Sequence, residues 1–250
     1  MKIATYNLRF GGKSGNRIHW QKILGSVNPD ILLLQETLPP TEYLPEDTYQ
    51  HYQQQIHWVA VNGRPWGSAV YVHQGQITPL EPLSDKFSGW VVGVKVTDFG
   101  KPIEKEKSLY IYSVHAPSIK SSYVKQVNLI LDAIQNQIPN KADVIIGGDL
   151  NINIGVRHPS EELQQQYPKL MARFRRELGL MNCWQMANPN CNLPQTLRWS
   201  NDKTKPYHCD GIFVPAKWYQ YLEKSEVLSG DDWNILSDHN PVVAWLEIRK

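Results

Sequence analysis

The sequence of 250 residues is poor in cysteine and contains no long apolar run. Its three cysteines, Cys183, Cys191 and Cys209, are an odd number without CxxC spacing, so we expect reduced thiols rather than a disulfide framework or a structural zinc site. No apolar run approaches the roughly 18 residues that a membrane-spanning helix needs. The sequence therefore predicts neither a membrane span nor a disulfide-stabilised scaffold.

The chain also has little excess of either charge, because 26 lysine and arginine residues nearly balance 24 acidic residues and leave a net charge of +2. Any binding to nucleic acid would therefore depend on a local basic face. The first residues, Met1 to Asn7, enter a strand-like pattern and lack the apolar stretch and cleavage site of a signal peptide. We expect a cytoplasmic location and infer no obligate protein partner.

Hydrophobic residues make up 41% of the chain and charged residues 20%, a globular composition without an evident linker, so we expect one large layered domain spanning residues 1–250. Apolar patterns predict strands at 3–8, 31–34, 68–72, 90–96, 109–114, 196–199, 209–214 and 242–248. Helical spacing predicts helices at 17–27, 124–134 and 161–178. Few connections between strands are helices, which favours mixed, mostly antiparallel sheets packed face to face and flanked by helices.

The segment DVIIGGDLN, residues 143–151, is the most informative stretch. Val144 to Ile146 are expected to form a buried strand, which Gly147-Gly148 would end with a turn. Asp149 and Asn151 lie two residues apart, so in an extended chain their side chains point the same way. That arrangement suits a phosphate and its attacking water, although an ordinary polar turn would use the same residues.

Other polar residues follow or precede apolar runs in the same manner. Glu36 follows Ile31 to Gln35, and a carboxylate buried there without a partner would be unfavourable, unless it reaches solvent at the strand's edge. The complete set of such residues is Asn7, Glu36, His115, Asp149, Asn151, Asp210, Asp238 and His239.

The adjacent pair Asp238-His239 precedes the last strand. Neighbours in an extended chain do not usually face each other, so the partner of His239 should lie elsewhere. Asp210 is the best candidate, because an Asp bonded to one imidazole nitrogen fixes the tautomer and favours the charged ring. A capping role for Asp238 and a surface position for His239 are the alternatives.

Taken in order, the motifs TYNLRF, LLLQET, YSVHAP, IIGGDLNI, HCDGIFV and LSDHNPVVAWL resemble those of the endonuclease/exonuclease/phosphatase superfamily. The resemblance spans Thr5 to Leu246. It implies an α/β (α+β) four-layer sandwich of two mixed, mostly antiparallel β-sheets flanked by helices. It also implies a hydrolase that cleaves phosphoesters with a divalent metal.

The resemblance further implies a metal site. Glu36 would be the principal Mg²⁺ ligand, with Asn7 beside it and Asp238 near the metal or its bound water. Hard oxygen ligands of this kind suit Mg²⁺, with Mn²⁺ as the alternative ion.

The remaining motif residues are implied to act on the phosphate. Asp149 would position or deprotonate the attacking water, and Asn151 would hold a phosphate oxygen. His239, oriented by Asp210, would stabilise charge on the phosphorus oxygens. His115 would contact the phosphate or protonate the leaving group. Metal, base and cationic donors must act together, because a general base alone supplies roughly 10²–10⁴-fold.

His115 in YSVHAP resembles the branch of deoxyribonucleases, sphingomyelinases, deadenylases and phosphoinositide phosphatases. Abasic-site endonucleases usually carry Tyr there, which disfavours that role. Ile146 and Gly211 depart from the phosphoinositide-phosphatase pattern of Trp and Arg. The expected absence of a signal peptide disfavours a secreted sphingomyelinase or digestive nuclease.

We therefore expect a nuclease with nucleic acid as its substrate, working by in-line attack of water. Cations and aromatics in loops near the motifs would suit a phosphate backbone with stackable bases, although each one could be an ordinary surface charge or packed ring. They are Arg64, Trp66, Lys120, Arg157, Arg198, Trp199, Lys203, Lys205, Tyr207 and Trp233.

Two other functions stay open. One is hydrolysis of a small-molecule or lipid phosphoester in a narrower pocket. The other is a catalytically silent nucleic-acid-binding module, which would be expected to have lost Glu36, Asp149 or His239.

Overall fold

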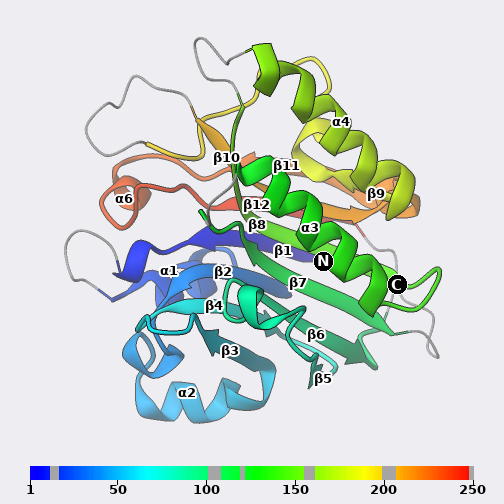
Figure 1. The fold of residues 1–250 in the computed structure, drawn as a ribbon. Coiled ribbons are helices and arrows are strands. Elements are labelled where there is room, and N and C mark those ends of the chain that lie inside the picture. The colour runs from blue at the N-terminus through cyan, green and yellow to red at the C-terminus, as the bar shows by residue number, and fades with distance from the viewer. Residues whose placement is uncertain (12–16, 101–107, 119–121, 155–160, 199–206, 248–250) are drawn as a thin grey trace.

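Two six-stranded sheets form the centre of the fold in a computed structural model that describes residues 1–11, 17–100, 108–118, 122–154, 161–198 and 207–247 (Figure 1). The first sheet has the order β11 (Leu222–Val227), β12 (Val242–Leu246), β1 (Lys2–Asn7), β2 (Ile31–Thr37), β4 (Gly67–Val72) and β3 (Ile56–Ala60). The second has the order β5 (Gln76–Pro79), β6 (Val91–Thr97), β7 (Leu109–His115), β8 (Asp143–Ile154), β10 (His208–Pro215) and β9 (Leu180–Asn182).

Each sheet contains one parallel pair of strands, β1 with β2 and β7 with β8, and the other neighbouring strands are antiparallel. A helix connects the strands of each parallel pair: α1 (His19–Ser26) joins β1 to β2, and α3 (Tyr123–Gln137) joins β7 to β8. The prediction of mixed, mostly antiparallel sheets is therefore confirmed. The other helices are α2 (Glu46–Tyr52), α4 (Glu161–Glu177), α5 (Cys183–Ala187) and α6 (Asp231–Asn234).

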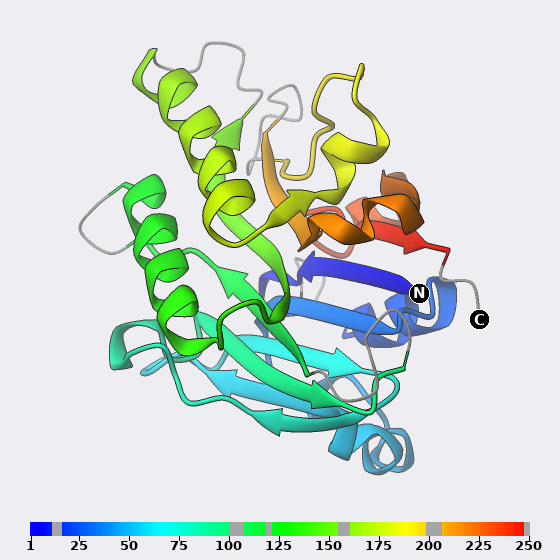
Figure 2. The same ribbon diagram turned by 90° about the vertical axis from the view of Figure 1, so that its right-hand side faces the viewer.

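Three hydrophobic clusters divide the fold into four layers. Alternate residues of β2 serve two of them: Ile31 and Leu33 face the second sheet, whereas Leu32 and Leu34 face α1. Both faces of this strand are buried, which explains its continuous apolar run. The apolar stripe of α3 packs on β7 and β8 in the third cluster, and Figures 1 and 2 show α3 and α4 on the outer face of that sheet. The predicted four-layer arrangement is confirmed.

The helices predicted at 17–27, 124–134 and 161–178 correspond to α1, α3 and α4. The predicted strand at 196–199 is not regular in the described part, where Leu197 forms only isolated bridges to Tyr207 and His239. Strands β3, β5, β9 and β11 were not predicted, because they are short or polar and pair at or near sheet edges. Within the described residues, no helix combines the length and apolarity needed to cross a membrane.

The prediction that Gly147-Gly148 ends its strand with a turn is wrong, because β8 continues through both residues. Gly148 has a φ of 148°, and a Cβ there would lie 1.9 Å from the carbonyl oxygen of Val114. A Cβ on Gly147 would lie 2.5 Å from Leu33 Cδ1 of the other sheet. The two glycines therefore allow close approach of the neighbouring strand and of the facing sheet.

Candidate active site

The pairing of three strands places acidic and imidazole side chains in one row of the second sheet. His115, at the end of β7, is in register with Asp149 of β8, and Asp149 is in register with Asp210 of β10. All three residues are buried. Strand register alone therefore brings together residues that lie 34 and 61 positions apart in the sequence.

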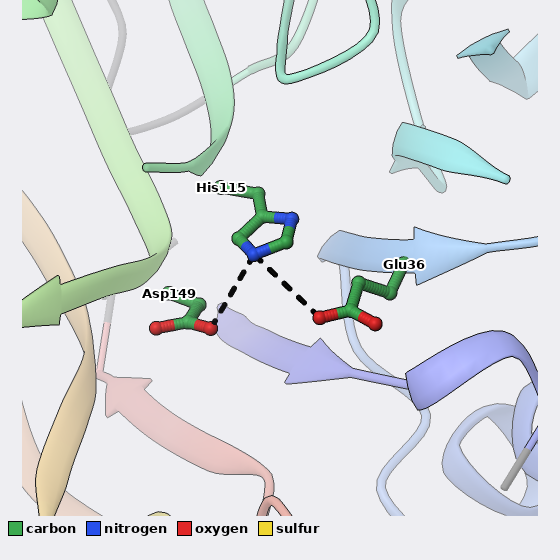
Figure 3. Close-up of side chains that lie close together, drawn as sticks. All are labelled: Glu36, His115 and Asp149. Atoms are coloured by element: carbon green, nitrogen blue, oxygen red, sulfur yellow. Dashed lines mark ion pairs between the residues drawn. The ribbon is translucent and has the colours of Figure 1, made fainter. Parts of the chain in front are cut away.

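The first sheet contributes Asn7 from the end of β1 and Glu36 from β2. Glu36 has a left-handed backbone with a φ of 48°, and the pairing of β2 with β4 shifts register between Leu34 and Thr37. A bulge of this kind changes the direction of a side chain at a strand end. The Glu36 carboxylate consequently faces His115 and Asp149 (Figure 3).

Gln35, next to Glu36, links the two sheets beneath the site. Its Nε2 donates to Ser113 Oγ at 2.9 Å, and Ser113 Oγ donates to the carbonyl of Leu34 at 2.9 Å. The Gln35 and Ser113 side chains are fully buried. This contact was not anticipated from the sequence, because it depends on how the two sheets pack.

A cluster of Asn7, Glu36, His115 and Asp149 forms where the sheets meet. Asn7 Nδ2 donates to Glu36 Oε1 at 3.1 Å and to Asp149 Oδ2 at 3.0 Å. His115 Nε2 lies 3.6 Å from Glu36 Oε1 and 3.8 Å from Asp149 Oδ2 (Figure 3). Two carboxylate oxygens from different sheets thus face one imidazole nitrogen.

Burial dominates the electrostatics of this cluster. It raises the pKa of Glu36, although the hydrogen bond from Asn7 opposes the shift. Burial also raises the pKa of Asp149 to about 6, against the attraction of His239. For His115, burial lowers the pKa to about 4 and outweighs the attraction of Asp149. The carboxylates therefore lack full compensation for their negative charge.

The structure pairs His239 with Asp210, the partner expected for it. Nδ1 of His239 lies 2.9 Å from Asp210 Oδ2, and its Nε2 lies 3.7 Å from Asp149 Oδ2. Burial disfavours the charged ring, but attraction to Asp210 and Asp149 and the Asp210 hydrogen bond outweigh it and raise the pKa of His239 to about 10. His239 is therefore a buried cation at neutral pH.

Asn151 and Asp238 flank the cluster. Asn151, with a φ of 53°, donates its backbone N–H to Asp149 Oδ1 at 2.8 Å and its Nδ2 to the carbonyl of Ala116 at 3.1 Å. Asp238 Oδ2 pairs with Arg9 at 2.9 Å. The structure thus holds the Asp238 carboxylate on Arg9, and its role as a metal ligand stays a prediction.

The donor chemistry of the cluster fits a divalent cation. The potential ligand atoms of Glu36, His115 and Asp149 lie within 4.8 Å of one another, as do those of Asp149, Asp210 and His239. Glu36 and Asp149 supply hard oxygen ligands, and the raised pKa of each carboxyl reflects a need for positive charge. The group of Asp149, Asp210 and His239 already contains the cationic His239 ring. The group of Glu36, His115 and Asp149 is therefore the better site for a metal cation.

Sequence reasoning missed two residues that shape the site besides Gln35. Arg9 carries the ion pair to Asp238, and its backbone N–H donates to Asn7 Oδ1 at 3.0 Å. Thr196 Oγ1 accepts from the backbone N–H groups of Cys209 and Asp210, at 2.8 and 3.2 Å. Arg9 could have been noticed only because it belongs to the motif TYNLRF. No sequence motif pointed to Thr196.

The loop residues expected to contact nucleic acid have different surroundings. Trp66 packs beside His115, with ring centroids 5.8 Å apart. Trp233 instead packs in the core against Tyr6, and Arg198 donates to Ser237 O and Asn240 Oδ1 next to the site. Arg64 is exposed, and Tyr207 bridges to Leu197. The other members of that set, Lys120, Arg157, Trp199, Lys203 and Lys205, lie outside the described residues.

The chain is similar to several known phosphoesterases. It is 28% identical over 178 residues to sphingomyelinase C of Listeria ivanovii, a match that covers 62% of this chain and 49% of that relative. An AP endonuclease from Archaeoglobus fulgidus superposes with a TM-score of 0.73 at 17% identity, over 99% of this chain and all of that one. The 3′ phosphatase NExo from Neisseria, bound to product DNA hairpin, superposes with a TM-score of 0.69 at 17% identity, over 98% of this chain and 99% of that one.

These structural similarities show the fold, and they agree with the two packed mixed sheets. A sequence model described as the Endonuclease/Exonuclease/phosphatase family matches residues 4–239. That match contains each residue of the buried carboxylate and imidazole cluster. The chain therefore belongs to the endonuclease/exonuclease/phosphatase family.

Proposed function

We propose that the protein is a divalent-metal-dependent nuclease that hydrolyses phosphodiester bonds of DNA or RNA. The observation that carries the proposal is the position of Asp149, which is buried between His115 and His239 and bonded to Asn7. A carboxyl group with a pKa of about 6 is suited to accept a proton from water near neutral pH. The DNA bound to NExo supports a polymeric substrate.

In this proposal each side chain has one task. Asp149 orients the attacking water and accepts its proton, and Asn151 binds a phosphate oxygen. His239, held by Asp210, donates to an oxygen of the phosphate as negative charge develops there. The lowered pKa of His115 favours contact by a neutral ring over proton donation to the leaving group.

Glu36 would be the principal ligand of the metal, with Asn7 beside it. Mg²⁺ or Mn²⁺ supplies Lewis-acid stabilisation of the phosphate when bound. Asp238 would act near the metal or its water, after exchange of its contact with Arg9.

Incubation with single- and double-stranded DNA and RNA, with Mg²⁺ or Mn²⁺ or with chelator, tests the proposal. We expect turnover of at least one polymer that chelator abolishes and that Asp149→Asn and His239→Ala reduce at least about 10²-fold. Glu223→Gln changes an exposed carboxyl on β11 and serves as the control. A lack of turnover of every polymer would contradict nuclease activity.

A second candidate follows from the similarity to sphingomyelinase C: hydrolysis of a lipid or small-molecule phosphodiester. Sphingomyelin in mixed micelles and bis(p-nitrophenyl) phosphate belong in the same assay. Metal-dependent turnover of these substrates alone would favour that candidate. Binding of nucleic acid without turnover of any phosphoester would favour the silent binding module.

A further inference from the structure

Three aromatic side chains from separate segments form a wall beside His115. The aromatic wall consists of Phe10 from η1 (Arg9–Gly11), Trp66 before β4 and Trp90 before β6. Ring centroids of Phe10 and Trp66 are 5.1 Å apart, and those of Trp66 and Trp90 are 5.2 Å apart. Trp66 and Trp90 lie 5.8 and 5.0 Å from the His115 ring. The wall therefore bounds the catalytic cluster on the side of His115.

The members of the aromatic wall differ sharply in exposure. Trp66 is only 7% exposed and Trp90 is half-buried, so both have partners within the protein. Phe10 is 45% exposed, and it is one of few large apolar side chains that project from the described surface. A single exposed apolar side chain is common on a protein surface, but Phe10 also contacts Trp66, whose ring lies beside His115.

Backbone geometry fixes Phe10 in this exposed position. Arg9 and Phe10 both have left-handed backbones, with φ of 47° and 56°, a conformation that residues other than glycine rarely adopt. Asn7 Oδ1 accepts from the Arg9 N–H and holds the start of this turn. The turn directs Arg9 onto Asp238 and Phe10 onto Trp66. Backbone strain in adjacent residues at a site is a feature of functional segments.

We propose that Phe10, supported by Trp66, is a stacking platform for a nucleobase attached to the reacting phosphate, and this inference rests on the proposed nuclease function. In a nucleotide a sugar separates the base from its phosphate. Trp66 likewise separates Phe10 from His115, which faces the carboxylates. The platform offers a π-face rather than hydrogen-bonding groups, so it would stabilise any base and not one sequence.

A quaternary ammonium headgroup is the other ligand that aromatic surfaces bind. Such a cation favours a cage of several ring faces, with Trp the strongest contributor. Here the Trp66 ring is 7% exposed and stands edge-on to Trp90 at 89°, and Phe10 is the most exposed ring of the aromatic wall. One flat exposed phenyl ring suits a stacked base better than an enclosed cation.

Binding and turnover together test the platform. With chelator present, fluorescence anisotropy measures the affinity of labelled single-stranded oligothymidylate and of an equally labelled abasic oligomer of the same length. We expect Phe10→Ala to weaken binding of oligothymidylate by about 5- to 150-fold and to leave the abasic oligomer unchanged. Phe10→Trp should restore binding, and Phe10→Leu, which keeps apolar volume without a flat ring, should not.

Tyr219→Ala is the matched control, because Tyr219 is a 52% exposed aromatic on η5 (Ala216–Tyr221), away from the cluster. Equal losses for both oligomers, or no loss for either, would overturn the platform. Hydrolysis of sphingomyelin that depends on Phe10, without an effect on oligothymidylate, would also overturn it. Wild-type turnover of the oligomer with Mg²⁺ tests the nuclease function separately, since the binding assay does not require catalysis.

Discussion

The Asp210 carboxylate lies 2.9 Å from Nδ1 of His239, and both side chains are buried. This contact leaves Nε2 of His239 directed at Asp149. The acid therefore fixes which nitrogen faces the reacting group, and it holds a charged ring where burial alone would deprotonate it. The pair would present a fixed positive charge to a phosphate in the proposed reaction.

Asp210→Asn is predicted to reduce kcat by about 10²-fold or more, because His239 would lose its charge partner and its defined tautomer. The alkaline limb of the rate profile should move from near pH 10, the pKa of His239, to a lower pH. Initial rates from pH 6 to 10.5 measure both effects. An unchanged alkaline limb would show that His239 does not act as the buried cation.

Asp149→Asn is predicted to reduce turnover at least about 10²-fold without loss of stability. Burial raises the pKa of Asp149 from 3.8 to about 6, so at pH 7 the folded state holds an ionised carboxylate that it disfavours. The neutral amide should raise the free energy of unfolding by about 1–3 kcal/mol in chelator. Urea unfolding at pH 7 measures this change, and a clear decrease would contradict the origin assigned to the pKa shift.

Metal binding is predicted to stabilise the folded protein through Glu36. At a Mg²⁺ concentration about 100 times the dissociation constant, the gain in unfolding free energy would be about 2.7 kcal/mol. Glu36→Gln should remove most of the thermal shift, whereas Glu223→Gln should retain it. Thermal unfolding with Mg²⁺, Mn²⁺ or chelator measures the shift. A full shift in the Glu36 variant would place the ion elsewhere.

Strand patterns were easier to predict from the sequence than the backbone geometry and sheet contacts around the polar cluster. Asn7, Glu36 and His115 lie at or next to strand ends, and Asp238 and His239 precede β12, because apolar runs interrupted by polar residues reveal where strands leave the core. Asp149 and Asn151 instead lie within β8. The left-handed backbone of Glu36 and the contact of Gln35 with Ser113 were not predictable in the same way. They depend on a bulge and on sheet packing, which involve residues far apart in the chain.

The error at Gly147-Gly148 has a related cause. A glycine pair signals a turn when only local conformation is considered. Here both positions must be glycine because of close neighbours. A side chain at Gly148 would clash with the Val114 backbone, and one at Gly147 would clash with the Leu33 side chain. Local sequence does not distinguish a turn from close approach of another strand, so tertiary packing decides between them.

The hydrogen bond between Gln35 and Ser113 is predicted to couple the two sheets. Gln35→Met leaves the Ser113 hydroxyl with fewer partners, and we expect a loss of about 1–3 kcal/mol in unfolding free energy. In a double-mutant cycle with Ser113→Ala, the coupling energy should be about 0.5 kcal/mol or more. Urea unfolding of the four proteins measures it. Strict additivity would show that the contact does not join the sheets energetically.

His208 is predicted to make the fold sensitive to mild acid. Its ring is 3% exposed, and Nδ1 lies 2.8 Å from the carbonyl oxygen of Pro194. Burial lowers the pKa of His208 from 6.5 to about 4, despite the hydrogen bond to Pro194. Between these values the unfolded chain binds more protons than the folded one, so stability is retained above pH 6.5 and lost as the pH falls toward 4.

At pH 5 the His208 ring is expected to lower the free energy of unfolding by about 2 kcal/mol. His208→Asn keeps a side-chain N–H close to the position of Nδ1 and has no proton to gain, so its stability should fall less between pH 7.5 and pH 5. Urea unfolding at the two pH values measures the difference between the proteins. His51→Asn, on the exposed surface of α2, is the control and should follow the wild type. Equal acid sensitivity of the wild type and His208→Asn would assign the loss to other groups.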